Sequence, residues 1–353
     1  MKKYKKVLIF GPIAPPAGGI SIHIARLKYL IQDDFLLDFI DESNIIKEEY
    51  FSIKSFNLFV YLKKIFLADI LFIQTGGSAL RKFHILMGKL FFKKIIVTIH
   101  GYSKVKKMPN LLIDSLFFQL CNKIILVNPY IFKKLFLSRR KCVFQHAFIP
   151  PLMLVEVDLP FYISDWLEIS KKKGNVILCA NASRLNIFEN QDLYGLDMCI
   201  EVTKRLVSNG YSVSCIYTVS SLENCDELFL KYQQSIIELN LQENFLLLNG
   251  IFSFPKIIDN SDIVLRPTNA DGDAITIREA LFLGKSILAS DIVQRPQGTL
   301  LFKTRDHDDF YLQLSSLLNG FQSSSILSST DIDSINSEYR KCYSGIINSV
   351  LYS

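Results

Sequence analysis

The apolar positions of the first 150 residues fall into short runs separated by longer stretches with helical spacing. These runs are VLIFG, FLLDFI, DILFIQ, KIIVTI and KIILVN. Runs that are apolar throughout, rich in β-branched residues and joined by helical patterns are typical of buried parallel strands connected by crossover helices. The pattern predicts a Rossmann-like domain over residues 1–150.

The same alternation returns after Pro150-Pro151 and a weakly patterned connector. The later runs are NVILCA, YSVSCIY, NFLLLNG, DIVLRP and KSILAS. They predict a second Rossmann-like domain over residues 173–330, with residues 151–172 as the linker. A chain of 353 residues, about half of them apolar, is long enough for two domains of ordinary size. We therefore expect an α/β fold with two Rossmann-like domains facing a central cleft.

Two apolar stretches resemble targeting or membrane segments, and the sequence disfavours both readings. The N-terminus MKKYKKVLIF has a basic start, but its apolar run ends at Gly11 and Pro12, which predicts a first strand and not a signal peptide. The most apolar window, FNLFVYLKKIFLADILFIQ, is interrupted by Lys63, Lys64 and Asp69. We expect no membrane-spanning helix, since no run approaches the ~18 apolar residues that one needs.

Charge divides the chain into two unlike halves. The formal net charge is +6, but residues 1–150 contain 24 basic and 9 acidic residues, and the remainder contains 16 and 25. The basic half predicts contact with an anionic surface, either nucleic acid or the inner leaflet of a membrane; an idle solvated face is the alternative. The seven cysteines form no CxxC pair and have no histidine at ligand spacing, so they predict a reducing compartment and no zinc site.

The loops that leave the carboxyl ends of the predicted strands are where ligands bind in open α/β sheets. Gly18 and Gly19 precede a predicted helix, where glycines allow the backbone to approach a phosphate; a plain turn would explain them equally well. His100 ends the strand KIIVTI, and Arg184 follows the first strand of the second half. An arginine at such a position suits a diphosphate, because its planar donors bind two oxygens at once.

The stretch DGDAITIREALFLG, from Asp271 to Gly284, predicts a loop followed by a helix. The free amides of a first turn containing Ile275 and Thr276 form an anion site. Glu279, one turn further along, can hydrogen-bond a neutral diol such as a ribose, while Asp271 is expected at the rim of the loop. The simpler alternative is that Asp271 and Asp273 only cap the helix.

These motifs, in this order, resemble the family-four retaining glycosyltransferases of the GT-B fold. The family carries two acids separated by seven residues, which Asp271 and Glu279 match with one conservative change. The resemblance extends over nearly the whole chain through PAGGISIHIARL, VTIHG, CVFQHAFIPP, NASRL, NFLLLNGIFS and GKSILASDIVQRPQGTLLF. It implies a C-terminal helix, residues 331–353, that crosses back to the first domain.

The resemblance also implies roles for the matched residues. His100, Arg184 and Asp271 would be catalytic, with the arginine neutralising the diphosphate and the other two flanking the transferred sugar. Glu279 would hold the ribose, and the amides of Gly19, Ile275 and Thr276 would meet the diphosphate. The implied donor-binding residues are Gly18, Gly19, Ile251, Arg266, Ile275, Thr276, Glu279 and Arg295.

One departure from the family pattern concerns a cation. The family has Lys-Gly shortly after the arginine, whereas this chain has a longer segment ending in Tyr194-Gly195. Arg266 and Arg295 are the candidates to replace that lysine. The donor would be a UDP- or GDP-linked sugar, and the resemblance implies no cofactor and no metal. A metal-binding reading of the DGD sequence is the alternative.

The basic first half is expected to bind the acceptor. Residues 81–94 and 130–141 interleave cations with large apolar groups, as interfacial helices do. The acceptor and membrane candidates are Lys82, Lys89, Phe91, Phe92, Lys93 and Lys94. The resemblance implies a lipid-diphosphate-linked saccharide acceptor of surface-polysaccharide synthesis (O-antigen, capsule or exopolysaccharide), and a cytoplasmic protein attached to the inner face of the cell membrane.

Two rival functions remain open from the sequence alone. A sugar-nucleotide epimerase shares the two-domain architecture, and a non-catalytic partner subunit with a decayed donor site would explain the missing lysine. Nucleic-acid binding is supported by charge alone, because no recognised motif accompanies it. The sequence does not specify the sugar, the base or the linkage.

Overall fold

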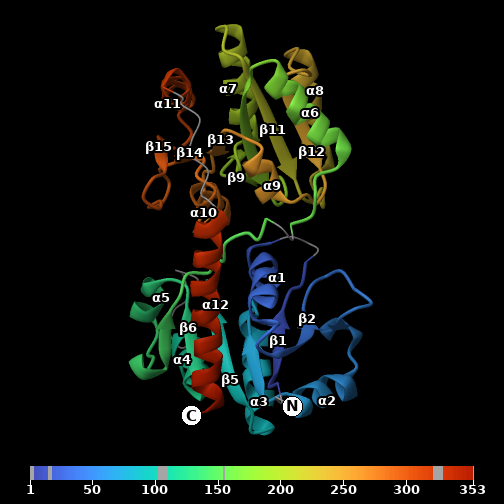
Figure 1. Cartoon of the computed structure of the whole chain (residues 1–353), viewed down its shortest axis with the longest axis vertical. Coiled ribbons are helices and arrows are strands. Elements are labelled where there is room, and N and C mark those ends of the chain that lie inside the picture. Colours follow the sequence, from blue (N-terminus) through green and yellow to red (C-terminus); the bar gives the residue numbers. More distant parts are fainter. Residues whose placement is uncertain are drawn as a thin grey trace. The chain divides into compact units, whose positions relative to one another are not determined.

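Seven strands of the first unit form one parallel sheet, in the order β3-β2-β1-β4-β5-β6-β7 (Figure 1). The chain is described by a computed structural model that covers residues 4–14, 18–101, 110–153, 156–272, 274–320 and 329–352. The strands are β1 (Lys6–Gly11), β2 (Leu36–Asp41), β3 (Phe51–Ser52), β4 (Ile70–Ile73), β5 (Lys94–Ile99), β6 (Lys123–Leu126) and β7 (Cys142–Phe144). All five runs predicted for this half are strands.

Helices cover both faces of this sheet, since its strands are apolar on both sides. The helices are α1 (Gly19–Ile31), α2 (Leu58–Leu67), α3 (Ser78–Leu90), α4 (Asn110–Leu120), α5 (Pro129–Lys134) and α12 (Ser329–Leu351), with 3₁₀ turns at Ile53–Ser55 and Arg139–Lys141. Ile24 of α1 and Ile347 of α12 pack with Phe72 of β4. Ile85 of α3 and Phe118 of α4 pack with Leu71 on the opposite face.

The C-terminal helix belongs to the first unit. Residues Thr330–Ser353 group with Met1–Ile149, and α12 runs alongside the first sheet (Figure 1). Tyr343, Ile346, Ile347 and Val350 of this helix are buried in the core that α1 also covers. The return of the chain to its first unit therefore rests on apolar packing.

The second unit, Pro150–Ser329, has a six-stranded parallel sheet in the order β12-β11-β8-β13-β14-β15. Its strands are β8 (Val176–Ala182), β11 (Val213–Val219), β12 (Phe245–Asn249), β13 (Ile263–Arg266), β14 (Ser286–Ser290) and β15 (Leu300–Phe302). A hairpin of β9 (Ile187–Phe188) and β10 (Gln191–Asp192), which the sequence did not predict, follows β8. The predicted α/β fold with two parallel-sheet domains is confirmed.

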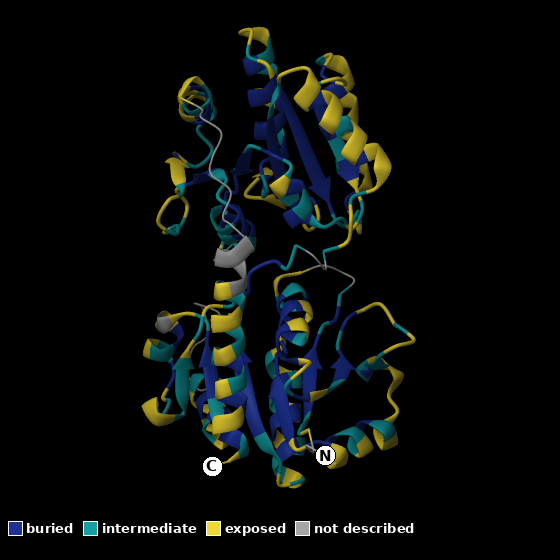
Figure 2. Cartoon of the chain, viewed as in Figure 1, coloured by how far each residue is buried: buried dark blue, intermediate teal, exposed yellow. Residues whose placement is uncertain are grey.

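Helices also cover both faces of the second sheet. They are α6 (Phe161–Lys172), α7 (Leu196–Ser208), α8 (Asp226–Glu238), α9 (Phe254–Asp259), α10 (Ile275–Phe282) and α11 (His307–Asn319). The expectation that residues 151–172 are only a linker is wrong for its second half, because α6 buries Ile163 and Leu167 against this sheet. Figure 2 shows the buried strands within the more exposed helices of each unit. Among the described residues, no helix is long and apolar enough to cross a membrane.

Candidate functional site

The loop between β13 and α10 ends in a helix start that no described side chain caps. The strand ends at Arg266, and α10 begins at Ile275 after Ala274, whose backbone is extended (φ −69°, ψ 120°). Alanine has no side-chain oxygen to accept the first amides, so the first turn keeps the character of an anion site. Asp273, one of the two predicted capping residues, lies outside the described residues.

Asp271 lies inside this loop and is paired with two arginines. Its side chain is only 9% exposed. Arg266 donates from Nε to Oδ2 at 3.1 Å and from Nη2 to Oδ1 at 3.2 Å, and Arg295 donates from Nη1 to Oδ2 at 2.8 Å. Its carboxylate is therefore turned to the two guanidinium groups, which the expectation of an acid at the rim of the loop did not include; its role beside the donor stays a prediction. Simple capping by Asp271 does not describe this arrangement either.

The cluster carries a surplus of positive charge. Two arginines and one carboxylate leave a net charge of about +1 in a site largely shielded from water, where a charge without a counterion is costly. Burial alone would raise the pKa of Asp271, but the neighbouring Arg266 and Arg295 lower it below its ordinary value. Asp271 is thus ionised at neutral pH, and the surplus charge favours a further anion.

Arg295 is more tightly held than Arg266. Its side chain is 2% exposed, and it also donates to the backbone oxygen of Ser290 at 3.0 Å, to Ser290 Oγ at 3.2 Å and to Thr268 Oγ1 at 3.4 Å. Arg266 is 11% exposed. Arg266 is therefore the better placed of the two to meet a ligand, and Arg295 is the better placed to fix Asp271.

Asn181, which the sequence analysis missed, joins this cluster to the helix start. It is the second-to-last residue of β8. Its side-chain oxygen accepts a hydrogen bond from Thr276 Oγ1 at 3.1 Å, and its backbone oxygen accepts one from Arg266 Nη1 at 3.4 Å. Its position at a strand end was the available signal. The structure thus brings Arg266, Asp271, Arg295 and Thr276 together through Asn181.

Tyr194 and Gly195 stand where the resemblance implies Lys-Gly, so a tyrosine ring takes the place of the lysine. The Arg266 guanidinium lies 5.3 Å from the centroid of the Tyr194 ring, within the range of a cation–π contact. Gly195 has φ 71°, and a Cβ there would lie 2.3 Å from the backbone oxygen of Pro267, so only glycine fits. The segment therefore adds no cation and instead supports one side of Arg266.

The remaining predicted residues of the second unit differ in how far they are buried. Arg184 is exposed two residues beyond β8 and makes no ion pair with the described part of the chain. Glu279 is 3% exposed on the inner side of α10, and Ile275 is half-buried at its start. Ile251 follows β12 and is 52% exposed. Their predicted roles stay predictions.

The glycine loop of the first unit is held from both sides. Gly18 precedes α1 and Gly19 is its first residue, while Ser21 Oγ accepts from the Gly18 amide at 2.8 Å. On the other side of the loop, the buried Asp41 accepts from the Ile13 amide at 2.9 Å. The ends of the loop between β1 and α1 are therefore fixed, which is what a backbone that meets a ligand requires.

His100 lies at the carboxyl end of β5 as a neutral imidazole. Its Nε2 is 2.7 Å from Gln74 Oε1, and its ring meets that of His23 edge-on at 4.9 Å between centroids. Because the amide oxygen accepts, Nε2 carries the proton. Burial, His23 and Arg81 hold the pKa of His100 well below its ordinary value. The ring can thus give or accept a hydrogen bond without bearing a charge at neutral pH.

Several of the cations predicted to meet an acceptor or membrane are used inside the protein. Lys82 pairs with Asp114 at 2.8 Å, Lys93 donates to the carbonyl oxygens of Phe66 and Ala68 at 2.7 and 2.8 Å, and Lys94 donates to that of Leu351 at 3.0 Å. Lys93 and Lys94 thereby stabilise the C-terminal ends of α2 and α12, where carbonyls lack partners, whereas Lys82 links α3 to α4. Their predicted role toward an acceptor or a membrane stays a prediction.

The other residues of that prediction differ among themselves. Lys89 and Phe91 are half-buried near the end of α3, whereas Phe92 is 95% exposed and has φ 52°. The segment 130–141 is not one interfacial helix, because α5 ends at Lys134 and a separate 3₁₀ turn covers Arg139–Lys141. Of the residues in this prediction, Phe92 is thus the exposed one, while Phe91 and the four lysines are half-buried.

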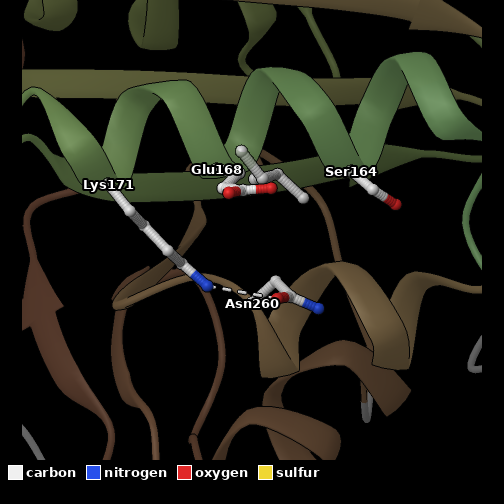
Figure 3. Close-up of a pocket in the computed structure, with 5 residues that line it drawn as sticks. Ser164, Glu168, Lys171 and Asn260 are labelled. Carbon is white, nitrogen blue, oxygen red and sulfur yellow. Dashed lines mark hydrogen bonds between the residues drawn. The ribbon is translucent and has the colours of Figure 1, made fainter.

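A separate hollow of about 260 Å³ lies between α6 and α9 (Figure 3). It is lined by Ser164, Leu167, Glu168, Lys171 and Asn260. Lys171 closes one side by donating to Asn260 Oδ1 at 3.1 Å. None of the predicted site residues lines it. Within the described ranges, no group of three or more His, Cys, Asp or Glu residues is arranged to hold a metal ion.

Comparisons with known proteins were made at the level of sequence and of structure. No protein-family model and no curated protein matches the sequence. HepE of Anabaena, solved with UDP and glucose, matches at TM-score 0.68 and 13% identity over 97% of this chain and 100% of its own. A Rickettsia africae glycosyltransferase matches at 0.66 and 14% over 99% and 96%.

A third solved structure, sucrose-phosphate synthase of Thermosynechococcus elongatus, matches at TM-score 0.62 and 11% identity over 98% of this chain and 100% of that one. All three matches extend over both units. At these identities the likeness concerns the fold alone. The chain thus has the two-domain GT-B fold in which these enzymes are built.

Proposed function

We propose that the chain is a glycosyltransferase that takes a sugar from a nucleotide-diphosphate donor. The observation that carries the proposal is the cluster of Arg266, Asp271 and Arg295 beside the start of α10. It lies at the carboxyl ends of parallel strands, where open α/β sheets bind ligands. HepE, of the same fold, was solved with UDP-glucose, which supports a donor of this class.

The proposed mechanism uses charge stabilisation. The bond between the sugar's anomeric carbon and the donor phosphate breaks, and the electron pair leaves with the diphosphate. Arg266 and the first amides of α10 stabilise that developing charge, with Arg184 as a second cation. The acceptor hydroxyl forms the new bond on the same face and passes its proton to the departing phosphate. No resident metal or cofactor is assigned to these steps.

Asp271 has an indirect role in this proposal. Because Arg266 donates to both of its oxygens, Asp271 fixes the plane of that guanidinium, and Arg295 in turn fixes Asp271. We infer that Asp271 positions a cation for the diphosphate and does not contact the sugar. Glu279 would then hold the ribose.

The acceptor we propose is a saccharide linked to a lipid diphosphate, as in surface-polysaccharide synthesis, and the enzyme would work at the inner face of the cell membrane. The basic first unit supports an anionic acceptor. A non-catalytic subunit is the rival that the missing lysine favours. Such a subunit would bind a nucleotide weakly or not at all and transfer nothing.

A panel of UDP, UDP-sugars, GDP and GDP-sugars tests the donor proposal by the shift in melting temperature. We expect stabilisation by one base only, followed by transfer of the matching sugar to a lipid-linked acceptor with retention at the anomeric carbon. Stabilisation without transfer, and with epimerised donor as the product, would identify the epimerase alternative. If no nucleotide stabilises the protein, the donor site is not functional.

A further inference from the structure

The outer faces of α2, α3 and α4 expose large apolar side chains where solvent-facing helices normally carry polar ones. On α2, Phe59 is 77% and Phe66 66% exposed; on α3, Leu86 is 52% and Leu90 65% exposed; on α4, Leu116 is 67% exposed. The spacing from Phe59 to Phe66 is seven residues, so both lie on one face of α2. An apolar surface of this kind marks an interaction site.

The three helices form one continuous layer. In chain order, α2 connects β3 to β4, α3 connects β4 to β5, and α4 connects β5 to β6. Strands β4, β5 and β6 are neighbours in the sheet, whereas β2 and β1 lie between β3 and β4. Ile65, Ile85 and Phe118, one from each helix, are buried in a single core cluster on the same face of the sheet. Figure 1 shows α2 and α3 beside one another at this side of the first unit.

Polar contacts lock these helices together. The hydroxyl oxygen of Tyr61 in α2 lies 2.8 Å from Nδ1 of His84 in α3. The other ring nitrogen of His84, Nε2, lies 3.1 Å from Glu42 Oε1. Tyr61 also stacks on Phe83 at 5.6 Å between ring centroids. Lys82 joins α3 to Asp114 of α4. The apolar groups therefore project from a fixed surface.

Charge along this layer has one sign. The three helices contain five cations and a single acid, Asp114, which is buried and paired with Lys82. Arg81 is buried and Lys64 pairs with Asp38, so the exposed Lys63 and the half-buried Lys89 are the cations that this face offers. Lys63 is exposed between Phe59 and Phe66. Apolar groups interleaved with cations and lacking exposed carboxylates complement an anionic lipid surface, into which rings insert while ammonium groups stay at the phosphates.

We propose that the outer face of α2, α3 and α4 docks the chain on an anionic membrane. The proposal deepens the proposed function, since it rests on a membrane-embedded acceptor, and it replaces Lys93 and Lys94 with the apolar groups of three helices as the main contacts. A second copy of the chain fits this face less well. Two such faces in contact would bring cations against cations with no carboxylates between them.

The test uses one exposed substitution on each helix: Phe59→Gln, Leu86→Gln and Leu116→Gln together. The matched control is Leu230→Gln, Ile237→Gln and Leu312→Gln on α8 and α11 of the second unit, which are 61%, 50% and 60% exposed. Both full-length variants are measured for sedimentation with vesicles of phosphatidylglycerol and phosphatidylethanolamine, and with vesicles of phosphatidylcholine alone.

We expect the parent and the control variant to bind the anionic vesicles. The α2–α4 variant should bind them at least about 10-fold more weakly, because it lacks three apolar groups that would insert into the membrane. Lys63→Glu should weaken binding to the anionic vesicles and leave the residual binding to phosphatidylcholine unchanged. Melting temperatures of the variants check that they fold.

Three outcomes would overturn the proposal: equal vesicle binding by the α2–α4 variant and the parent, no vesicle binding by the parent, or a parent dimer that the variant alone abolishes. The stabilisation by nucleotides is measured in the same samples. Vesicle binding that persists without any nucleotide effect would reject the proposed function and keep the docking surface. Stabilisation by a nucleotide without vesicle binding would reject the docking surface and keep the proposed function.

Discussion

Arg295 Nη1 and Asp271 Oδ2 lie 2.8 Å apart in an ion pair almost closed to water, although 24 residues separate them in sequence. The second arginine on the same carboxylate, Arg266, makes this a cation-rich cluster. The carboxylate of Asp271 thus accepts hydrogen bonds from guanidinium groups that would also bind a diphosphate. Under the proposed function, binding of the donor's diphosphate would be an exchange of partners within a cluster that is already formed.

Asp271→Asn removes the anion from two largely buried cations. Breaking such a pair is expected to lower the unfolding free energy by about 3 kcal/mol. UDP would supply the missing charge, so its stabilising effect on melting temperature should be larger in the variant than in the parent, whereas UMP should show a smaller difference. Turnover should fall, because Arg266 loses its orientation. A variant that responds to UDP as the parent does but loses its response to UDP-sugar would instead show direct contact with the sugar.

Glu279→Ala tests the ribose contact. Loss of hydrogen bonds to a charged group is expected to weaken UDP binding by about 1.5 to 3 kcal/mol, measured by calorimetry. Inorganic pyrophosphate contains no ribose, so its affinity for the parent and for the variant should be equal. If UDP binds the variant as tightly as the parent, Glu279 does not hold the nucleoside.

The parts predicted from the sequence are those that depend on local pattern. KIIVTI and DIVLRP are short, mostly apolar runs that the pattern identifies as buried strands, and the loop before Ile275 is identified as a helix start. The partners of Asp271 were not predicted, since the loop after β14 returns Arg295 only in the folded unit. The hydrogen bonds of Lys93 were not predicted either, because their acceptors, the carbonyl oxygens of Phe66 and Ala68, lie at the end of a different helix.

The docking face was beyond sequence analysis for another reason. In LFVYLKKIFL nearly every position is apolar, so periodicity does not distinguish Ile65, which is fully buried, from Phe66, which is 66% exposed. The side of α2 that meets the sheet is set by packing against its neighbours. The roles of His100, Arg184 and Glu279 remain predictions.

The buried His23 makes stability depend on pH. Burial lowers the pKa of His23 from 6.5 to about 4. The hydrogen bond to the Ala147 oxygen opposes this shift, and the nearby charge of Arg26 adds to it. Below pH 6.5 the unfolded chain binds this proton and the folded chain does not, so stability falls as the pH drops from 6.5 toward 4. The contribution of His23 is about 3 kcal/mol over this range.

His23→Asn removes that titration and retains an amide donor for Ala147. Denaturant unfolding of the variant between pH 7 and 4.5 should therefore give a shallower loss of stability than the parent shows. Tyr4, exposed near the N-terminus, offers a neutral control in Tyr4→Asn, which should keep the parent's slope. Identical slopes for parent and His23→Asn would mean that His23 is charged in the folded protein.

Arg184→Ala tests whether a solvent-exposed cation acts on the transition state. Charge builds on the diphosphate only as the sugar bond breaks, so Arg184 should contribute more to turnover than to donor affinity. We expect kcat to fall about 100-fold, the scale for loss of one stabilising donor, while the Kd for the nucleotide sugar changes much less. Lys303→Ala removes an exposed cation elsewhere in the second unit and should leave both quantities unchanged. A loss in affinity as large as the loss in kcat would assign Arg184 to ground-state binding, and the burden of charge stabilisation would then rest on Arg266 and the amides of α10.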